Sequence, residues 1–242
     1  MFKSGNPALK ADTFTGFNVG ESNETMTLEG TTNKSYILLG LVVLFSILVW
    51  NYQSLVLPFF LPIIIVNLVL GFVIIWKKEL APTLAPIYAI LEGIFIGVIS
   101  SIFELKYPGI IIQAISLTFG VFLTMLVLYQ TKIIKPTENF KLGVVAATGG
   151  IAIIYLISLF GSATGLYNIG YIHEVGGIIG ILISVFIVTI AALNLVLDFD
   201  FIESGVEAKV PKYMEWYAAF GLLVTLVWLY LEILRLLSKS RD

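Results

Sequence analysis

Carboxyl and amide side chains inside long apolar segments are the first candidates for chemistry in this sequence. Glu92 lies in the apolar segment 83–103. It comes about nine residues after the start of that segment, so in a helix it would lie about 14 Å deep. A polar side chain at that depth is costly, which makes it a functional candidate by default. A carboxyl in such a setting is a candidate proton sensor or relay.

A second group of polar side chains recurs along the apolar segment 175–198. Its members share one helical face because they are spaced three or four residues apart: Ser184, Val188, Ala191, Asn194 and Asp198. Small and polar residues occupy this face, whereas Ile and Leu occupy the opposite one, so we expect the polar face to look into the protein. Asp198 is expected to close this helix on its cytoplasmic side.

Structural roles for the same carboxyls are open alternatives. Glu92 would be a neutral carboxyl that is hydrogen-bonded to a neighbouring helix. Gly93 and Gly97 form a Gly-xxx-Gly pair, which allows another helix to approach closely and would bury Glu92 against protein. Asp198 would be a helix-end residue at the level of the lipid headgroups, like the acidic residues that follow it.

The elements that would position these side chains are membrane-spanning helices. Of the 242 residues, 58% are hydrophobic and 12% are charged, whereas soluble domains have roughly 45–50% apolar and about 25% charged residues. A spanning helix needs about 20 mostly apolar residues. The segments that meet this requirement are 36–52, 55–76, 83–103, 109–131, 142–161, 175–198 and 213–237. The sequence therefore predicts an all-α polytopic integral membrane protein, a bundle of about seven transmembrane helices.

Two regions and an orientation follow from this pattern. Residues 1–33 are rich in Gly, Ser, Thr, Asn and acidic residues, and we interpret them as a polar, flexible N-terminal tail. Residues 34–242 form the predicted seven-helix transmembrane domain. With the tail in the cytoplasm, ten basic residues of the tail and the connections lie inside and one lies outside. We therefore expect a multipass protein of the cell membrane, such as a bacterial inner membrane, with its N-terminus in the cytoplasm.

The C-terminal end of the last segment departs from this charge rule. Arg235, Lys239 and Arg241 would lie outside if segment 213–237 crosses the membrane, and we expect it to cross because it is long and apolar. Arg235 also follows Glu232 at an i,i+3 spacing, which predicts an ion pair at the membrane interface.

The composition excludes most enzyme classes. The chain has no Cys and a single His, His173, so thiol catalysis, thiolate metal sites and zinc sites with two histidines are excluded. The last apolar segment has no Lys for a retinal Schiff base, and the sequence has no Gly-x-Gly-Asp motif of an aspartyl intramembrane protease. We therefore expect no enzymatic activity and no cofactor. The net charge of −2 argues against a nucleic-acid partner.

Three stretches of the sequence carry a family resemblance: LEGIFIGVIS at 91–100, LNLVLDFDFIE at 193–203 and PKYMEWYAAFG at 211–221. They resemble the Bax inhibitor/YccA family, and the last two are similar to its C-terminal signature. The opening SGNPAL at 4–9 is similar to a bacterial branch of that family. The resemblance extends over nearly the whole chain. It implies a seven-helix fold with the last helix at the centre of the bundle.

The resemblance also implies a pH-sensitive calcium leak that is gated near its cytoplasmic end by two hydrogen-bonded aspartates. Asp198 matches the first of these. The second matches Thr225, which can hydrogen-bond to a carboxyl but cannot share a proton with it in a coupled titration. Glu92 and Glu215 are alternatives for the missing carboxylate, and the sequence leaves the choice between them open.

Two functions are consistent with these observations. The first is a pH-sensitive cation leak or proton-responsive channel with Ca²⁺ as the transported ion. Its candidate proton-sensing or gate residues are Asp198, Glu92, Thr225 and Asn194. The alternative is a non-conducting membrane interaction protein that regulates a membrane protein partner, such as a quality-control protease. A single cavity that held Asp198, Glu92 and Thr225 would favour the gate, whereas separate positions would argue against a gate built from these three residues.

Overall fold

The computed structural model describes residues 24–164 and 177–241, and it describes residues 159–164 by their backbone alone. Within these ranges the only β-type pairing is an isolated bridge between Thr25 and Pro211. The α-helices are α1 (Leu28–Val49), α2 (Gln53–Val56), α3 (Phe60–Trp76), α4 (Ala81–Lys106), α5 (Ile110–Gln130), α6 (Glu138–Thr164), α8 (Gly177–Glu207) and α9 (Met214–Lys239). Two short 3₁₀ turns are η2 (Leu57–Phe59) and η3 (Lys78–Leu80).

Among the described residues, seven helical stretches are long and apolar enough to cross a membrane, and each corresponds to one of the predicted segments. The predicted all-α, seven-helix membrane architecture is therefore confirmed. The second stretch is interrupted near its start because Pro58 lies in η2, between α2 and α3. A proline has no backbone N–H to donate, so it is tolerated best at such a helix start.

The first helix begins earlier than the sequence pattern indicated. α1 starts at Leu28, six residues before the predicted start of the transmembrane domain at residue 34. Thr27 caps this helix, because its side-chain oxygen accepts a hydrogen bond of 2.9 Å from the backbone N–H of Gly30. The part of the predicted tail that precedes residue 24 lies outside the described residues.

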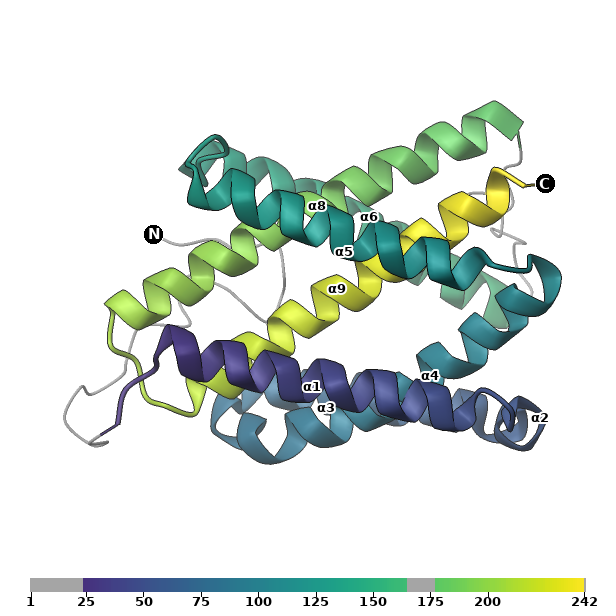
Figure 1. The fold of residues 1–242 in the computed structure, drawn as a ribbon, viewed down its shortest axis with the longest axis horizontal. Coiled ribbons are helices and arrows are strands. Elements are labelled where there is room, and N and C mark those ends of the chain that lie inside the picture. The colour runs from purple at the N-terminus through teal and green to yellow at the C-terminus, as the bar shows by residue number, and fades with distance from the viewer. Residues whose placement is uncertain (1–23, 165–176, 242) are drawn as a thin grey trace.

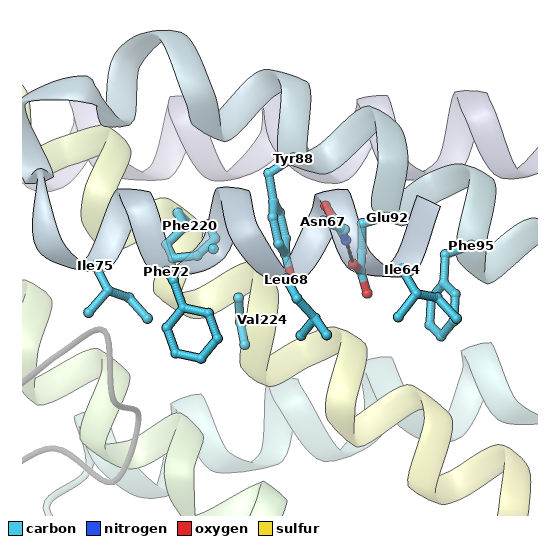
Figure 2. Close-up of a pocket in the computed structure, with 11 residues that line it drawn as sticks. Ile64, Asn67, Leu68, Phe72, Ile75, Tyr88, Glu92, Phe95, Phe220 and Val224 are labelled. Carbon is cyan, nitrogen blue, oxygen red and sulfur yellow. Dashed lines mark hydrogen bonds between the residues drawn. The ribbon is translucent and has the colours of Figure 1, made fainter. Parts of the chain in front are cut away.

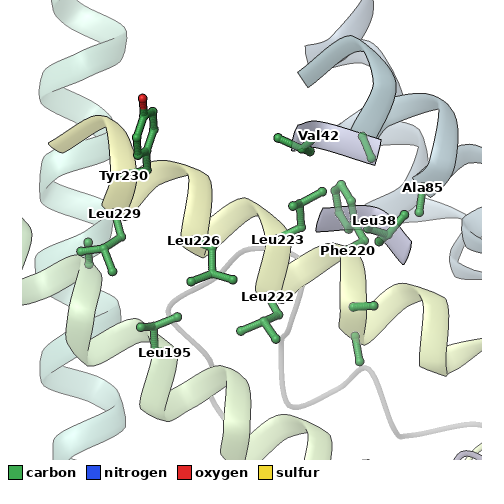
Figure 3. Packing of buried hydrophobic residues seen from close by; sticks show 14 of the residues in the cluster. Leu38, Val42, Ala85, Leu195, Phe220, Leu222, Leu223, Leu226, Leu229 and Tyr230 are labelled. Atoms are coloured by element: carbon green, nitrogen blue, oxygen red, sulfur yellow. The ribbon is translucent and has the colours of Figure 1, made fainter. Parts of the chain in front are cut away.

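The last helix lies at the centre of the bundle, as the resemblance implied. α9 runs diagonally between α1, α3 and α4 on one side and α5, α6 and α8 on the other (Figure 1). Its buried side chains face both groups. Phe220 and Leu223 point toward Leu38 of α1, while Leu195 of α8 lies on the opposite side of α9 (Figure 3). Because lipid tails are as apolar as leucine, van der Waals packing holds this centre together more than the hydrophobic effect does.

A stripe of small residues brings α4 against α1. Its members recur at i,i+4 along α4: Ala81, Ala85, Ala89, Gly93 and Gly97. A Cβ atom on Gly93 would lie 2.6 Å from the carbonyl oxygen of Val42, and one on Gly97 would lie 2.7 Å from that of Ser46. The backbones of the two helices are therefore too close for any larger residue. The predicted close approach of a helix at the Gly-xxx-Gly pair is confirmed, and the approaching helix is α1.

The two ends of the bundle are named here by residues that lie on them. The Leu28 end holds the start of α1, the end of α5, the end of α8 and the start of α9. The Lys239 end holds the end of α1, the end of α4, the start of α8 and the end of α9. Large apolar side chains between the two ends, such as Ile47, Leu61 and Phe72, are exposed on the outer faces of the helices. They form the surface that lipid would cover.

Candidate functional site

The predicted polar face of α8 is buried. Ser184, Ala191, Asn194 and Asp198 all have almost no exposed surface, and Val188 packs partly buried against the core. The periodicity argument, which placed these residues on the inward face, is therefore confirmed. Because the opposite face of the helix is apolar and partly exposed, this polar stripe follows the contact of α8 with the rest of the bundle.

Asp198 is 0% exposed and lies in the interior of α8. The helix continues nine residues beyond it, to Glu207. The expectation that Asp198 closes the helix is therefore wrong, and so is the alternative that it is a helix-end residue. Hydropathy ends the apolar segment at residue 198. The backbone stays helical because Phe199, Phe201 and Ile202 beyond it are buried in the core, and the polar residues between and after them find partners.

One of these partners is an ion pair between α6 and α8. The Lys141 ammonium lies 2.6 Å from the carboxylate of Asp200, and the Lys141 side chain is almost completely buried. Asp200 follows Asp198 by two residues, so the pair fixes this part of α8 against the start of α6 near the Leu28 end. Lys141 precedes the predicted apolar segment 142–161, so hydropathy alone places it in a connection between helices.

Asn194 joins α8 to the middle of α6. Its side-chain N–H donates to the hydroxyl of Thr148 and to the carbonyl oxygen of Ile190, both at 2.8 Å. Its side-chain oxygen is buried and has no hydrogen-bond partner among the described residues. A buried, unsatisfied carbonyl oxygen carries a free-energy cost of about 1–3 kcal/mol. One turn from Asp198, it is an acceptor that a proton donor or a cation could use.

Thr225 is buried in α9, and its hydroxyl donates to the carbonyl oxygen of Gly221 at 3.4 Å, within its own helix. Such a long bond is weak, but Thr225 has a further interaction in the structure, so this bond alone does not set the orientation of its side chain.

Glu92 lies in a different place, in a cavity of about 290 Å³ between α3, α4 and α9. The cavity is apolar except for Glu92, Asn67 and Tyr88. The Asn67 amide donates a hydrogen bond to the Glu92 carboxyl (Figure 2), and the Tyr88 hydroxyl is a second partner. None of Asp198, Asn194 and Thr225 lines this cavity in the described part of the chain. The four candidate residues therefore do not share one cavity.

The chain matches one protein-family model, described as Bax inhibitor 1 like, over residues 6–242. The chain belongs to this family. No curated protein and no solved structure gave a match. The earlier resemblance is thus confirmed at the level of the family, and the central last helix agrees with what that resemblance implied.

Glu215, one alternative for the missing carboxylate of this Bax inhibitor 1 like chain, has other partners. It is completely buried at the start of α9. Its carboxylate accepts hydrogen bonds from the backbone N–H and the hydroxyl of Thr27, at 3.0 and 2.9 Å, and lies 2.6 Å from the Lys34 ammonium. Glu215 therefore anchors the start of α1 to the start of α9 at the Leu28 end.

The predicted Glu232–Arg235 pair is present, with a separation of 2.9 Å. Its setting differs from the expected interface, because Glu232 is only 1% exposed. The Tyr155 hydroxyl of α6 donates to Glu232 at 2.6 Å, and the Trp228 indole N–H donates to it at 3.3 Å. The pair is thus part of a buried cluster that joins α6 to α9.

Several partners in these clusters were missed by the sequence analysis. Asn67 is the one amide in an otherwise apolar segment, and this signal could have identified it as a partner for a buried carboxyl. Thr27 and Tyr155 gave no signal, because their roles depend on which helices become neighbours. His173 lies outside the described residues. Among the described residues, no group of three His, Asp or Glu side chains is arranged to hold a metal ion.

Proposed function

We propose that this Bax inhibitor 1 like protein is a proton-responsive cation leak, with Ca²⁺ as the transported ion. The observation that carries the proposal is the position of Asp198, which has no exposed surface and lies in the interior of a helix long enough to span a membrane. Ionisable residues at such positions are rare in membrane proteins and mark ion and proton pathways. The family relationship supports the same function.

The chemistry next to Asp198 suits a hard cation. Its carboxylate and the side-chain oxygen of Asn194 lie one turn apart on the same buried face of α8. Carboxylate and amide oxygens are the ligands that Ca²⁺ prefers in proteins. Two side chains are too few to retain the ion, because Ca²⁺ takes 6–8 oxygen ligands. The pair would therefore attract a passing cation and release it again.

The proton response would come from Asp198 itself. A protonated carboxyl has no charge to attract a cation, whereas an ionised one does, so a change in pH changes the attraction for a cation at this position. The resemblance aligns Thr225 with the second aspartate of the family, and a hydroxyl cannot titrate in this range. We therefore propose a single-proton response in place of the two coupled steps of a carboxyl pair.

The orientation is part of the proposal. The excess of Lys and Arg at the Leu28 end supports a cytoplasmic location for that end, in the cell membrane. Asp198 then lies closer to the cytoplasmic end of α8 than to the outer end. No catalytic chemistry and no resident cofactor are proposed.

The test is Ca²⁺ flux into liposomes that contain the purified protein and an enclosed Ca²⁺ indicator, measured between mildly acid and alkaline pH. We expect Asp198→Asn to remove the pH dependence of the flux. Glu207→Gln is the matched control, because it removes one carboxylate from the same helix at an exposed position. Absence of flux in the wild type, or an unchanged pH profile in Asp198→Asn, would refute the proposal.

A second candidate, a non-conducting protein that regulates a membrane partner, is favoured by the contacts at the Leu28 end. The Lys212 N–H donates to the carbonyl oxygen of Glu24, and the N–H of Met26 donates to that of Val210. A partner that bound the segment before residue 24 could therefore act, through these hydrogen bonds, on the residues that lead into α9. This candidate predicts a stable complex that co-purifies with the chain and a wild type without flux.

A further inference from the structure

We infer that a cavity between α1 and α5 is a binding site for a phospholipid whose headgroup carries a primary ammonium, phosphatidylethanolamine. The cavity has a volume of about 620 Å³ and is lined by residues of α1, α5, α8 and α9. This volume lies within the range of about 300–1,000 Å³ that is typical of ligand sites. The site is independent of Asp198 and of the proposed leak, because neither Asp198 nor Asn194 lines it in the described part of the chain.

The cavity exists because two helices pack on the same partners and leave a space between themselves. α1 and α5 each contact α8 and α9, and they lie on opposite sides of α9 (Figure 1). The residues at the rim are strongly exposed, with Tyr36 on α1 and Leu123 on α5 exposed by 69% and 55%. The cavity therefore opens sideways, toward the region that lipid chains would occupy.

The length of the cavity fits one acyl chain in one leaflet. Its lining residues on α1 extend from Leu28 to Leu39, and those on α5 extend from Phe119 to Gln130. Both stretches correspond to about 16 Å of helix, at 1.5 Å per residue. Half of a hydrocarbon core is about 15 Å thick. The lining residues Phe122, Leu222 and Leu226 are buried or half-buried, so they offer an acyl chain an apolar wall.

The mouth of the cavity selects the headgroup. The charged residues that line it are Glu203 and Glu207, both exposed near the end of α8. None of its lining residues in the described part of the chain is Lys or Arg. The Tyr129 hydroxyl donates to Glu203, and an ionised carboxylate has about four acceptor positions, which leaves room for further donors. An ammonium with N–H donors fits this mouth, whereas a headgroup with a net negative charge and no ammonium would be repelled.

Native mass spectrometry of the purified full chain tests this inference. The protein is equilibrated in detergent with equal amounts of three lipids that share the same acyl chains: phosphatidylethanolamine, phosphatidylcholine and phosphatidylglycerol. We expect one phosphatidylethanolamine to be retained preferentially. Phosphatidylcholine carries a quaternary ammonium without N–H donors. Its retention therefore shows how much of the preference comes from the positive charge alone and how much needs hydrogen bonds from the headgroup. Equal retention of all three lipids, or no retained lipid, would overturn the inference.

Two pairs of variants locate the site. Glu203→Gln should lower the preference for phosphatidylethanolamine by about two- to fivefold, the range of an exposed charge pair, while Glu138→Gln at the start of α6 should leave it unchanged. Leu123→Trp should reduce retention of every lipid by filling the cavity. Leu117→Trp is the matched control, since Leu117 is also exposed on α5 but does not line the cavity. The same loss in both tryptophan variants would show that lipid binds elsewhere.

Discussion

The carboxylate of Glu215 accepts two hydrogen bonds from Thr27, one from its backbone N–H at 3.0 Å and one from its hydroxyl at 2.9 Å. Thr27 is also the N-cap of α1, so one residue ends the preceding segment, starts a helix and anchors it to the central helix. The contact links residues 188 positions apart in the sequence. It connects the start of α1 to the start of α9 at the Leu28 end of the bundle.

The connection between α1 and α9 at Glu215 depends on the charge of Lys34. Glu215 is completely buried, and its ammonium partner lies 2.6 Å away. Lys34→Met would leave the Glu215 carboxylate without its ion-pair partner, while the two hydrogen bonds from Thr27 remain. We expect the free energy of unfolding to fall by about 1–3 kcal/mol, the range for a buried group that loses one partner. Unfolding in a detergent–denaturant mixture, followed by tryptophan fluorescence, measures this change. Lys135→Met, at an exposed position, is the control, and an equal effect of the two substitutions would contradict the argument.

Thr225 gives a direct test of the single-proton response. Thr225→Asp would introduce the second carboxyl of the family pair, and two carboxyls in one site titrate in two separated steps because both cannot ionise cheaply. The pH profile of Ca²⁺ flux should therefore change from one step to a broader curve with two steps. Thr137→Asp, at an exposed position just before α6, should keep a single step. A single step in Thr225→Asp would mean that residues 225 and 198 do not interact.

The contact of α4 with α1 predicts opposite effects for two glycine substitutions. Gly97→Ala would place a methyl group 2.7 Å from the carbonyl oxygen of Ser46, and such overpacking costs about 1–3 kcal/mol. Gly120→Ala on α5 meets no atom within 4 Å, so the better helix propensity of alanine should stabilise the helix by up to about 1 kcal/mol. Measuring the unfolding of both variants in detergent shows whether the free energy of unfolding falls for Gly97→Ala and rises for Gly120→Ala. Destabilisation by Gly120→Ala, or none by Gly97→Ala, would contradict the close contact.

The seven helices could be predicted because the signal is local. A run of apolar residues long enough to span a membrane must be a helix there, since lipid offers no partner for backbone N–H and C=O groups. The inward face of α8 was predictable for a similar reason: the spacing of Ser184, Asn194 and Asp198 fixes a shared face without any knowledge of neighbours.

The ends of helices and the partners of charged residues were less predictable. The predicted apolar segment ends at residue 198, but α8 continues to Glu207. Phe201 and Ile202 are buried in the core there, and Asp200 pairs with a lysine of α6. The burial of Glu215 and Glu232 depends in the same way on Thr27 and Tyr155, which are distant in the sequence. These pairs depend on which helices pack against each other. The local pattern of a single sequence does not contain that information.

The buried cluster at Glu232 predicts that α6 is held to α9 by a hydroxyl group. Tyr155 donates to Glu232 at 2.6 Å and accepts a hydrogen bond from Arg235 at 3.1 Å. Tyr155→Phe removes both bonds and preserves the ring, and we expect a loss of about 1–3 kcal/mol, the range for a buried polar group that loses one hydrogen-bond partner. Detergent unfolding measures this loss.

A double variant in the same cluster distinguishes a local role of Tyr155 at Glu232 from a general loss of stability. Arg235→Met would remove the cation from a buried carboxylate, and its cost should exceed that of Tyr155→Phe. If both residues act on Glu232, the double variant should lose less stability than the sum of the two single variants, because they share one partner. Tyr36→Phe, at an exposed tyrosine on α1, should change stability little. Additive losses in the double variant would mean that Tyr155 stabilises α6 through contacts other than Glu232.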